Sequence, residues 1–349
     1  MKKILLASTA LVGFAGAAAA EVVITGDGRM GIVEQITLVD SSTDPNVVDP
    51  YLDTEIAFTS RVRIAFTLTS ETDSGVSFGG TIRADNADAG ANGSAGNVFM
   101  TGAFGKLSMG DVSGAAEAAV GNLSGVGLTG LGDLNEAIYL MQGNNDVLGD
   151  NQNERLSAFA LPSALYEYST GGFTGYIGLG NPSGIDLDGS IFDGYDTIDQ
   201  AYALGAKYAT DAWWVGAGYE NLSLQGYSTT ANASGVFEEI STNVDNWMLG
   251  AGGTFSGFTL NAQYGEGSGA EVDLTQYGFS VDYTFDATTL TAYWRDVELT
   301  DGSETLNRTP WGLGVSYDLG GGAAVKAGVV DPDVQGVDAI WDAGVSFSF

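Results

Sequence analysis

The chain has 349 residues, a formal net charge of −32 at pH 7, and neither cysteine nor histidine. Its 12 lysines and arginines argue against a nucleic-acid partner, because nucleic-acid binding needs clustered cations. Without cysteine or histidine the chain has no disulfides, no Ser-His pair and none of the usual zinc sites, so we expect no enzymatic activity and no required cofactor.

Residues 1–20 have the pattern of a secretory signal peptide. Two lysines precede an apolar run, and three alanines precede Glu21. This order of charged, apolar and small residues is typical of a cleaved export signal. We therefore expect residues 21–349 to be exported as a single domain.

The rest of the chain alternates apolar and polar residues in short segments. Val62, Ile64, Phe66 and Leu68, for example, alternate with arginines, an alanine and a threonine. Short turns are expected at 171–172, 210–211, 256–257, 286–287 and 320–321, and longer polar loops near 180–199, 222–243, 266–271, 299–309 and 331–336. Short turns alternating with long loops are typical of bacterial outer-membrane barrels. The pattern predicts an all-β fold, a 16-stranded antiparallel transmembrane β-barrel.

The two faces of each predicted strand differ in chemistry. One stripe places aromatics at its ends and aliphatics between them, as in Tyr277, Phe279, Val281, Tyr283 and Phe285. Lipid-facing surfaces of barrels have such aromatic girdles, whereas the small polar residues between these positions suit a wet lumen. A β-sandwich also alternates, and the persistence of the pattern along the whole chain favours the barrel.

The stretch from Asp111 to Pro162 lacks this alternation. Long connections without strand character are usually functional or disordered. Asp133 and Glu136 have the spacing of a helix N-cap and its N3 partner. Apolar residues then fall on one helical face: Leu134, Ala137, Ile138 and Met141. We expect a short amphipathic helix and a loop, about 111–162, that folds inward and narrows the lumen; the alternative is an ordinary surface excursion.

The last predicted strand ends on an aromatic residue, Phe349. Trp341, Val345 and Phe347 share its face. This strand resembles the C-terminal signature that the outer-membrane barrel assembly machinery reads. We therefore expect that machinery, outer-membrane lipid and lipopolysaccharide as partners.

Three blocks of sequence resemble the general porins of the alphaproteobacterial, Rhodobacter-type family: Thr25–Gly31, Ser60–Ile64 and Thr69–Gly80. The terminal Phe349 adds to the resemblance, which covers essentially the whole mature chain except the divergent loops. It implies a homotrimeric outer-membrane porin, a water-filled channel for passive diffusion of small polar solutes and ions. It also implies an eyelet, where arginines on the wall face acidic residues on the third loop.

The sequence supplies residues that match such an eyelet. Strand parity places four arginines on the polar face of three consecutive strands: Arg29, Arg61, Arg63 and Arg83. The acidic loop residues in question are Asp133, Glu136, Asp111 and Glu117, of which the first two are favoured. The loop lacks the motif of the enteric porins, so which carboxylates line the eyelet stays open. Three further cations have inward parity and either extend the basic wall or are scattered lumen charges: Lys207, Arg295 and Lys326.

The acidic composition leads to two further expectations. Acidic loops at the mouth concentrate cations, so we expect a cation-biased channel. Calcium binds carboxylate oxygens, so one loop cluster is a candidate structural calcium site, although a solvated acidic loop without a metal is the favoured interpretation: Asp186, Asp188, Asp193 and Asp196. Two other functions stay open, a plugged structural or adhesive outer-membrane barrel and a secreted acidic calcium-binding β protein.

Overall fold

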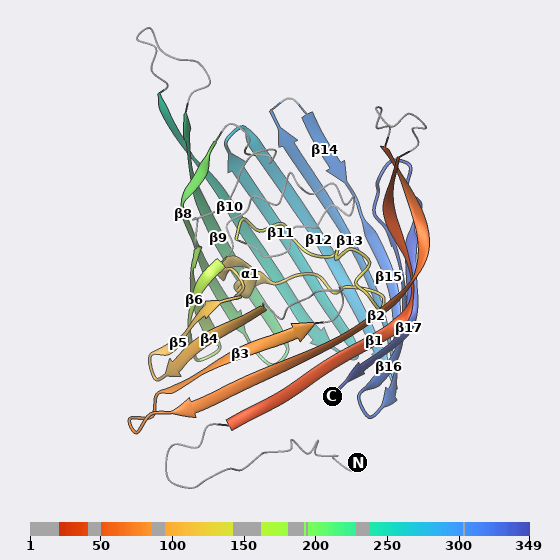
Figure 1. The fold of residues 1–349 in the computed structure, drawn as a ribbon, viewed down its shortest axis with the longest axis horizontal. Helices are drawn as coiled ribbons and strands as arrows, with labels where there is room; N and C mark the ends of the chain where they lie inside the picture. Colours follow the sequence, from red (N-terminus) through yellow and green to blue (C-terminus); the bar gives the residue numbers. More distant parts are fainter. Residues whose placement is uncertain are drawn as a thin grey trace.

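A computed structural model describes residues 21–40, 50–85, 95–141, 162–180, 192, 195–227, 238–302 and 304–349. Its strands form one antiparallel sheet that closes on itself (Figure 1). Strands that are consecutive in the chain pair with each other, except for two that both pair with the strand before them, and the first strand also pairs with the last. The predicted β-barrel is confirmed.

The strands of the described ranges are β1 (Glu21–Asp40), β2 (Pro50–Glu71), β3 (Ser77–Asp85), β4 (Ala95–Gly102), β5 (Gly105–Gly110), β6 (Pro162–Thr170), β7 (Phe173–Gly180), β8 (Thr197–Ala209), β9 (Trp213–Tyr227), β10 (Glu239–Phe255), β11 (Phe258–Gly269), β12 (Val272–Phe285), β13 (Thr288–Asp301), β14 (Glu304–Arg308), β15 (Trp311–Gly320), β16 (Ala323–Asp331) and β17 (Ile340–Ser348). Because β14 and β15 both pair with β13, they share one position, and the barrel has sixteen strand positions. The described helix is α1 (Ala115–Val120). None of the helical structure in these ranges is long and apolar enough to cross a bilayer.

Closure of the barrel joins the two ends of the described chain. The Phe349 N–H donates to the Gly26 carbonyl at 2.8 Å, and the Gly26 N–H donates to the Phe349 carbonyl at 3.3 Å. β1 is antiparallel to both β17 and β2. Closure pairs backbone groups that an open sheet would leave exposed at its edges.

The short turns agree with the predicted positions, but two predicted long loops are β-hairpins in the structure. Residues with positive φ lie at 171–172, 256–257 and 320–321, where short turns were expected. The long loop predicted at 266–271 was wrong, because β11 and β12 pair as far as Gly269 opposite Val272. Ala270 and Glu271, with φ of 55° and 63°, close that hairpin tightly. The loop predicted near 299–309 was wrong, because β14 pairs with β13, with Asp301 opposite Glu304 and Val297 opposite Arg308. Polar residues that indicated a loop are here part of the β ladder.

The outward face of the barrel is apolar and exposed. On β12, Phe279 is 54% exposed, whereas Gln276 and Ser280 on the opposite face are each 1% exposed. The outward stripe matches the predicted lipid-facing surface. The inward polar positions of β12 do not line an open lumen, because the long loop covers them.

The helix predicted from Asp133 onward was wrong. Asp133 has φ of 53° and begins a turn, in which the Glu136 N–H donates to its carbonyl at 2.9 Å. The following N–H groups donate to side chains instead of to a helical ladder: Ala137 to Asn122, Ile138 to Gln276, and Leu140 and Met141 to Glu220. The barrel wall, together with Asn122 of the loop itself, supplies the acceptors that a helix would have supplied. The helix of this loop, α1, lies earlier in the chain.

Candidate functional site

Residues 112–141 lie against the inner face of the barrel (Figure 1). The segment begins with α1, which contacts β7, β8, β9 and β10. Inward glycines make this approach feasible. A Cβ atom on any of them would lie 2.2–3.0 Å from α1: Gly178, Gly205, Gly216 and Gly218. The wall is thus shaped to accept the small side chains of the helix.

A second group of glycines lies under the later part of the segment. A Cβ on Gly314 would lie 2.9 Å from Val126, and one on Gly328 would lie 2.5 Å from the Gly127 nitrogen. Gly31 on β1 and Gly344 on β17, where the barrel closes, lie under Leu128. A Cβ atom on either glycine would lie 2.6 Å from the Leu128 Cδ2 atom. The inward glycines therefore follow the path of the loop around the wall.

Two buried carboxylates bind the loop backbone from opposite parts of the wall. Glu220 on β9 accepts from the Leu140 N–H at 2.8 Å, the Met141 N–H at 3.1 Å and the Asn246 side chain at 2.8 Å. Asp342 on β17 accepts from the N–H groups of Leu128 and Thr129 and from the Thr129 hydroxyl.

Two side chains on the wall between them bind the middle of the segment. Gln276 donates to the Ile138 carbonyl at 2.7 Å and accepts from the Ile138 N–H at 2.8 Å. Arg295, fully buried, donates to the Leu134 carbonyl at 2.9 Å. Since a buried backbone group without a partner is costly, these four side chains fix the position of the segment.

The predicted basic wall lies where the loop reaches β1. Arg29 and Arg61 lie directly opposite each other on β1 and β2, and Arg63 lies opposite Asp27. Arg61 forms an ion pair with Asp27 at 3.1 Å, and Arg29 donates to the Thr129 carbonyl of the loop at 3.2 Å. Like charges directly opposite on neighbouring strands are destabilising, so this arrangement is typical of a functional site rather than of a structural one.

Asp133 of the loop faces this wall. Burial raises the pKa of Asp133, while the nearby charges of Arg29, Arg61 and Arg63 act in the opposite direction. Asp133 forms no direct ion pair within the described residues, so the two groups of charges face each other without touching. The structure thus brings three of the four predicted arginines together with one of the two favoured carboxylates.

The other predicted residues lie elsewhere on the inner surface. The charge of Glu136 acts on Tyr139 and Arg295, whereas the charges that act on Asp133 are those of the arginine wall. Glu117 is on α1, where burial raises its pKa against the hydrogen bonds it accepts from Ser113 and Gly114.

Two predicted residues are exposed. Asp111 lies at the start of the loop, with its N–H bonded to the Gly96 carbonyl at 2.9 Å. Arg83, on β3, lies opposite Ala65 of β2. Neither is among the charged groups that act on Asp133.

The three additional cations have three different environments. Arg295 is buried under the loop and so does not extend a solvated basic wall. Lys207 lies over the Trp214 ring at 4.4 Å. Lys326 lines a cavity beside Arg29.

The candidate calcium site lies largely outside the described residues. Asp186, Asp188 and Asp193 are not among them, and Asp196 is exposed just before β8. No group of three or more candidate metal ligands occurs in the described ranges. The calcium site stays a prediction.

Sequence reasoning missed the loop-binding residues Glu220, Gln276 and Asp342. Each occupies an inward strand position, where its polar character is expected for any lumen residue. The inward glycines were a usable signal, because a run of residues without side chains on one face indicates that another segment packs there.

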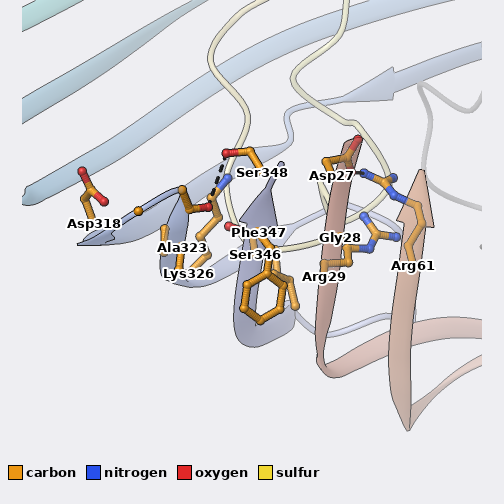
Figure 2. A pocket seen from close by; sticks show the side chains of 14 residues that line it. Asp27, Gly28, Arg29, Arg61, Asp318, Ala323, Lys326, Ser346, Phe347 and Ser348 are labelled. Atoms are coloured by element: carbon orange, nitrogen blue, oxygen red, sulfur yellow. Dashed lines mark hydrogen bonds and ion pairs between the residues drawn. The ribbon is translucent and has the colours of Figure 1, made fainter. Parts of the chain in front are cut away.

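The cavity beside Arg29 (Figure 2) has a volume of about 520 Å³. Gly321 and Gly322 of the short turn between β15 and β16 line it, so it lies at the short-turn end of the barrel. Leu128 of the loop lies on one side of it, and the small residues Ala324 and Ser346 line it from β16 and β17. Its charged lining residues come from both flanks: Asp27, Arg29, Arg61, Asp318 and Lys326. We call it the short-turn cavity.

Comparisons with known proteins agree with this architecture. The family model described as Gram-negative porin matches residues 7–334. A porin of Rhodobacter capsulatus is 32% identical over 347 residues, covering 94% of this chain and all of the relative. A porin of Fuscovulum blasticum is 27% identical over 303 residues, covering 83% of this chain and 90% of the relative.

Solved structures show the same fold. A porin structure refined at 1.8 Å has a TM-score of 0.68 and 32% identity over 94% of this chain and all of that chain. A triple mutant of Rhodopseudomonas blastica porin, at 21% identity, has a TM-score of 0.59 with the same coverage. Sequence relatedness over nearly the full length, together with the closed barrel, assigns this protein to the bacterial outer membrane and its lipid. The chain belongs to the Gram-negative porin family.

Proposed function

We propose that small polar solutes and ions diffuse passively through this barrel, and that their narrowest passage lies between Asp133 and the wall of Arg29, Arg61 and Arg63. The observation that carries the proposal is the opposition of Asp133 to these arginines without a direct ion pair. Opposite charges held apart by a rigid scaffold create a transverse field, in which polar solutes orient and apolar ones lose hydration without compensation. A sieve of this kind needs no catalytic group or cofactor.

We further propose that the channel favours cations. The chain carries 44 acidic and 12 basic residues, and an acidic surface raises the local concentration of cations at a pore mouth. The test is a planar lipid bilayer separating a tenfold gradient of KCl. We expect discrete conductance steps and a reversal potential of the sign given by potassium permeation. A reversal potential of the opposite sign would refute the cation bias, and an insulating film would refute the channel and favour a plugged barrel.

The proposed assembly is a homotrimer that reaches the outer membrane through the barrel assembly machinery. The family resemblance supports the trimer, and an outward face of Val98, Met100, Leu107 and Met109 on the short strands β4 and β5 offers apolar surface for it. Phe349, 72% exposed at the closure, is available to the assembly machinery. Cross-linking of detergent-extracted protein tests the trimer, and deletion of Phe349 tests recognition through its yield in the outer membrane.

A further inference from the structure

We propose that the short-turn cavity is a binding subsite for small oxyanions, in which a carboxylate or phosphate group lies between Lys326 and Arg29. The inference rests on the proposed function, because the solute would reach the cavity through the channel. It goes beyond that function, because a channel that filters solutes by size and by a transverse electric field does not need to bind any of them.

The residues that line the cavity carry three positive and two negative charges, and Asp342 and Asp133 act on Arg29 from outside the lining. Arg61 is already paired with Asp27 at 3.1 Å. Asp318 accepts from the Gly320 N–H at 2.7 Å and lies at one end of the cavity, beyond Lys326 (Figure 2). Lys326 has no hydrogen bond or ion pair with any part of the chain that the structure describes. An unpaired ammonium beside a guanidinium favours an anion from solution.

The strand register places Lys326 and Arg29 on two sides of a floor of small residues. Ala324 on β16 lies opposite Ser346 on β17, which lies opposite Arg29 on β1. Since β17 alone separates β16 from β1, the backbones of those two strands are about 10 Å apart. Long side chains from both flanks therefore extend over a short floor, with space between them.

Arg29 and Ser346 offer unused hydrogen-bond donors to the cavity. Arg29 donates to the Thr129 carbonyl through one nitrogen, and a guanidinium has five N–H donors in all. The Ser346 hydroxyl forms no hydrogen bond within the described residues. Oxyanions accept several charge-assisted hydrogen bonds at once, whereas a cation at this place would meet Lys326 and Arg29.

The size of the cavity points to organic anions. A volume of about 520 Å³ is within the range of small-molecule sites and exceeds what one inorganic anion fills. The subsite would give small organic acids a saturable path through a channel whose overall charge opposes them. We choose succinate and inorganic phosphate as probes. Both are oxyanions, but succinate presents carboxylate groups and inorganic phosphate presents a phosphate group.

The experiment is calorimetric titration of the folded, detergent-solubilised protein with each probe. We expect saturable binding of at least one probe, and the stronger one identifies carboxylate or phosphate as the preferred group. Lys326→Gln should weaken binding about tenfold, the effect of one charge-assisted contact, and Lys326→Arg should retain it. Ala324→Leu keeps every charge but fills the floor with a larger side chain, and should abolish binding. Heat-modifiable migration shows that each variant is folded.

The matched control is Lys207→Gln, which removes the same charge from β8, where Lys207 lies over Trp214 outside the cavity. We expect it to leave the affinity unchanged. Absence of saturable binding of both probes overturns the subsite, and so does equal weakening by Lys207→Gln and Lys326→Gln. Bilayer conductance keeps the two proposals apart. A conducting channel that binds neither probe refutes only the subsite, and an insulating barrel that binds a probe refutes only the proposed function.

Discussion

Asp342 binds Leu128 with both carboxylate oxygens, at 2.9 and 2.8 Å from the Leu128 nitrogen. The aspartate belongs to the last strand of the barrel and the leucine to the loop, 214 positions apart in the chain. Asp342 is 1% exposed, so water does not solvate its charge. The N–H and hydroxyl donors of the loop stabilise the carboxylate instead. The loop and the barrel closure thus depend on the same side chain.

Asp342→Asn should therefore loosen the loop at the closure. The amide keeps one acceptor but turns a donor toward the N–H groups of Leu128 and Thr129. We expect the free energy of unfolding to fall by about 3 kcal/mol, as when a buried charge network loses one partner, and single-channel current noise to rise. Urea unfolding followed by tryptophan fluorescence measures the first, and bilayer recordings the second. The control is Asp286→Asn, in the exposed turn before β13, where Asp286 has φ of 50°, a conformation that asparagine also adopts. It should change neither the free energy of unfolding nor the current noise.

Gly205→Ala tests whether the inward glycines hold α1 in place. The added Cβ would lie 2.2 Å from the Ala115 carbonyl oxygen, a backbone atom of α1. The helix must therefore move, at a cost of about 2 kcal/mol, and the conductance should change. The matched variant is Gly175→Ala on β7, where the nearest atom is a Phe173 ring carbon at 3.8 Å. Equal effects of the two substitutions would show that backbone entropy, not the close approach, explains the glycines.

The charges at the narrowest passage should set ion selectivity in opposite directions. Arg61→Gln removes a cation from the wall and should raise the ratio of potassium to chloride permeability about twofold, the effect of one screened charge a few ångströms away. Asp133→Asn should lower the ratio by a similar factor. Reversal potentials in a KCl gradient give the ratios. Asp211→Asn, in the exposed turn between β8 and β9, removes the same charge as Asp133→Asn and should leave the ratio unchanged. Shifts of the same sign in Arg61→Gln and Asp133→Asn would contradict the assignment.

The barrel was predictable from sequence because its two faces meet different solvents. Each outward residue, such as Phe279, must be apolar whatever its partners, so the alternation is visible without knowledge of the fold. The arginine wall was predictable for a related reason, since strand parity and adjacency alone place Arg29 beside Arg61.

The course of the loop was not predictable in the same way. Its helical spacing from Asp133 was real, but the acceptors for its N–H groups came from Gln276 and Glu220, more than 75 positions away in the chain. Local periodicity carries no information about such partners. The environment of Arg295, buried under the loop instead of facing water, was hidden for the same reason, because parity says which way a side chain points and not what covers it.

Glu117 gives the barrel a stability that depends on pH. Burial raises the pKa of Glu117, which means that the folded protein binds its proton more tightly than the unfolded chain does. The free energy of unfolding therefore falls as pH rises from the unfolded pKa through the raised folded one. Glu117→Gln removes this titration and keeps an oxygen acceptor for Ser113 and Gly114. The variant should be more stable than the wild type at pH 7, and the two should converge below about pH 4, where an unfolded glutamate is protonated.

Urea titrations across this pH range measure that difference. Glu71→Gln, at an exposed position at the end of β2, should leave the pH profile of the wild type unchanged. A Glu117→Gln variant that is less stable than the wild type at neutral pH, and equal to it in acid, would reverse the sign of the effect. Glu117 would then stabilise α1 as a carboxylate, and the hydrogen bonds from Ser113 and Gly114 would outweigh the cost of its burial.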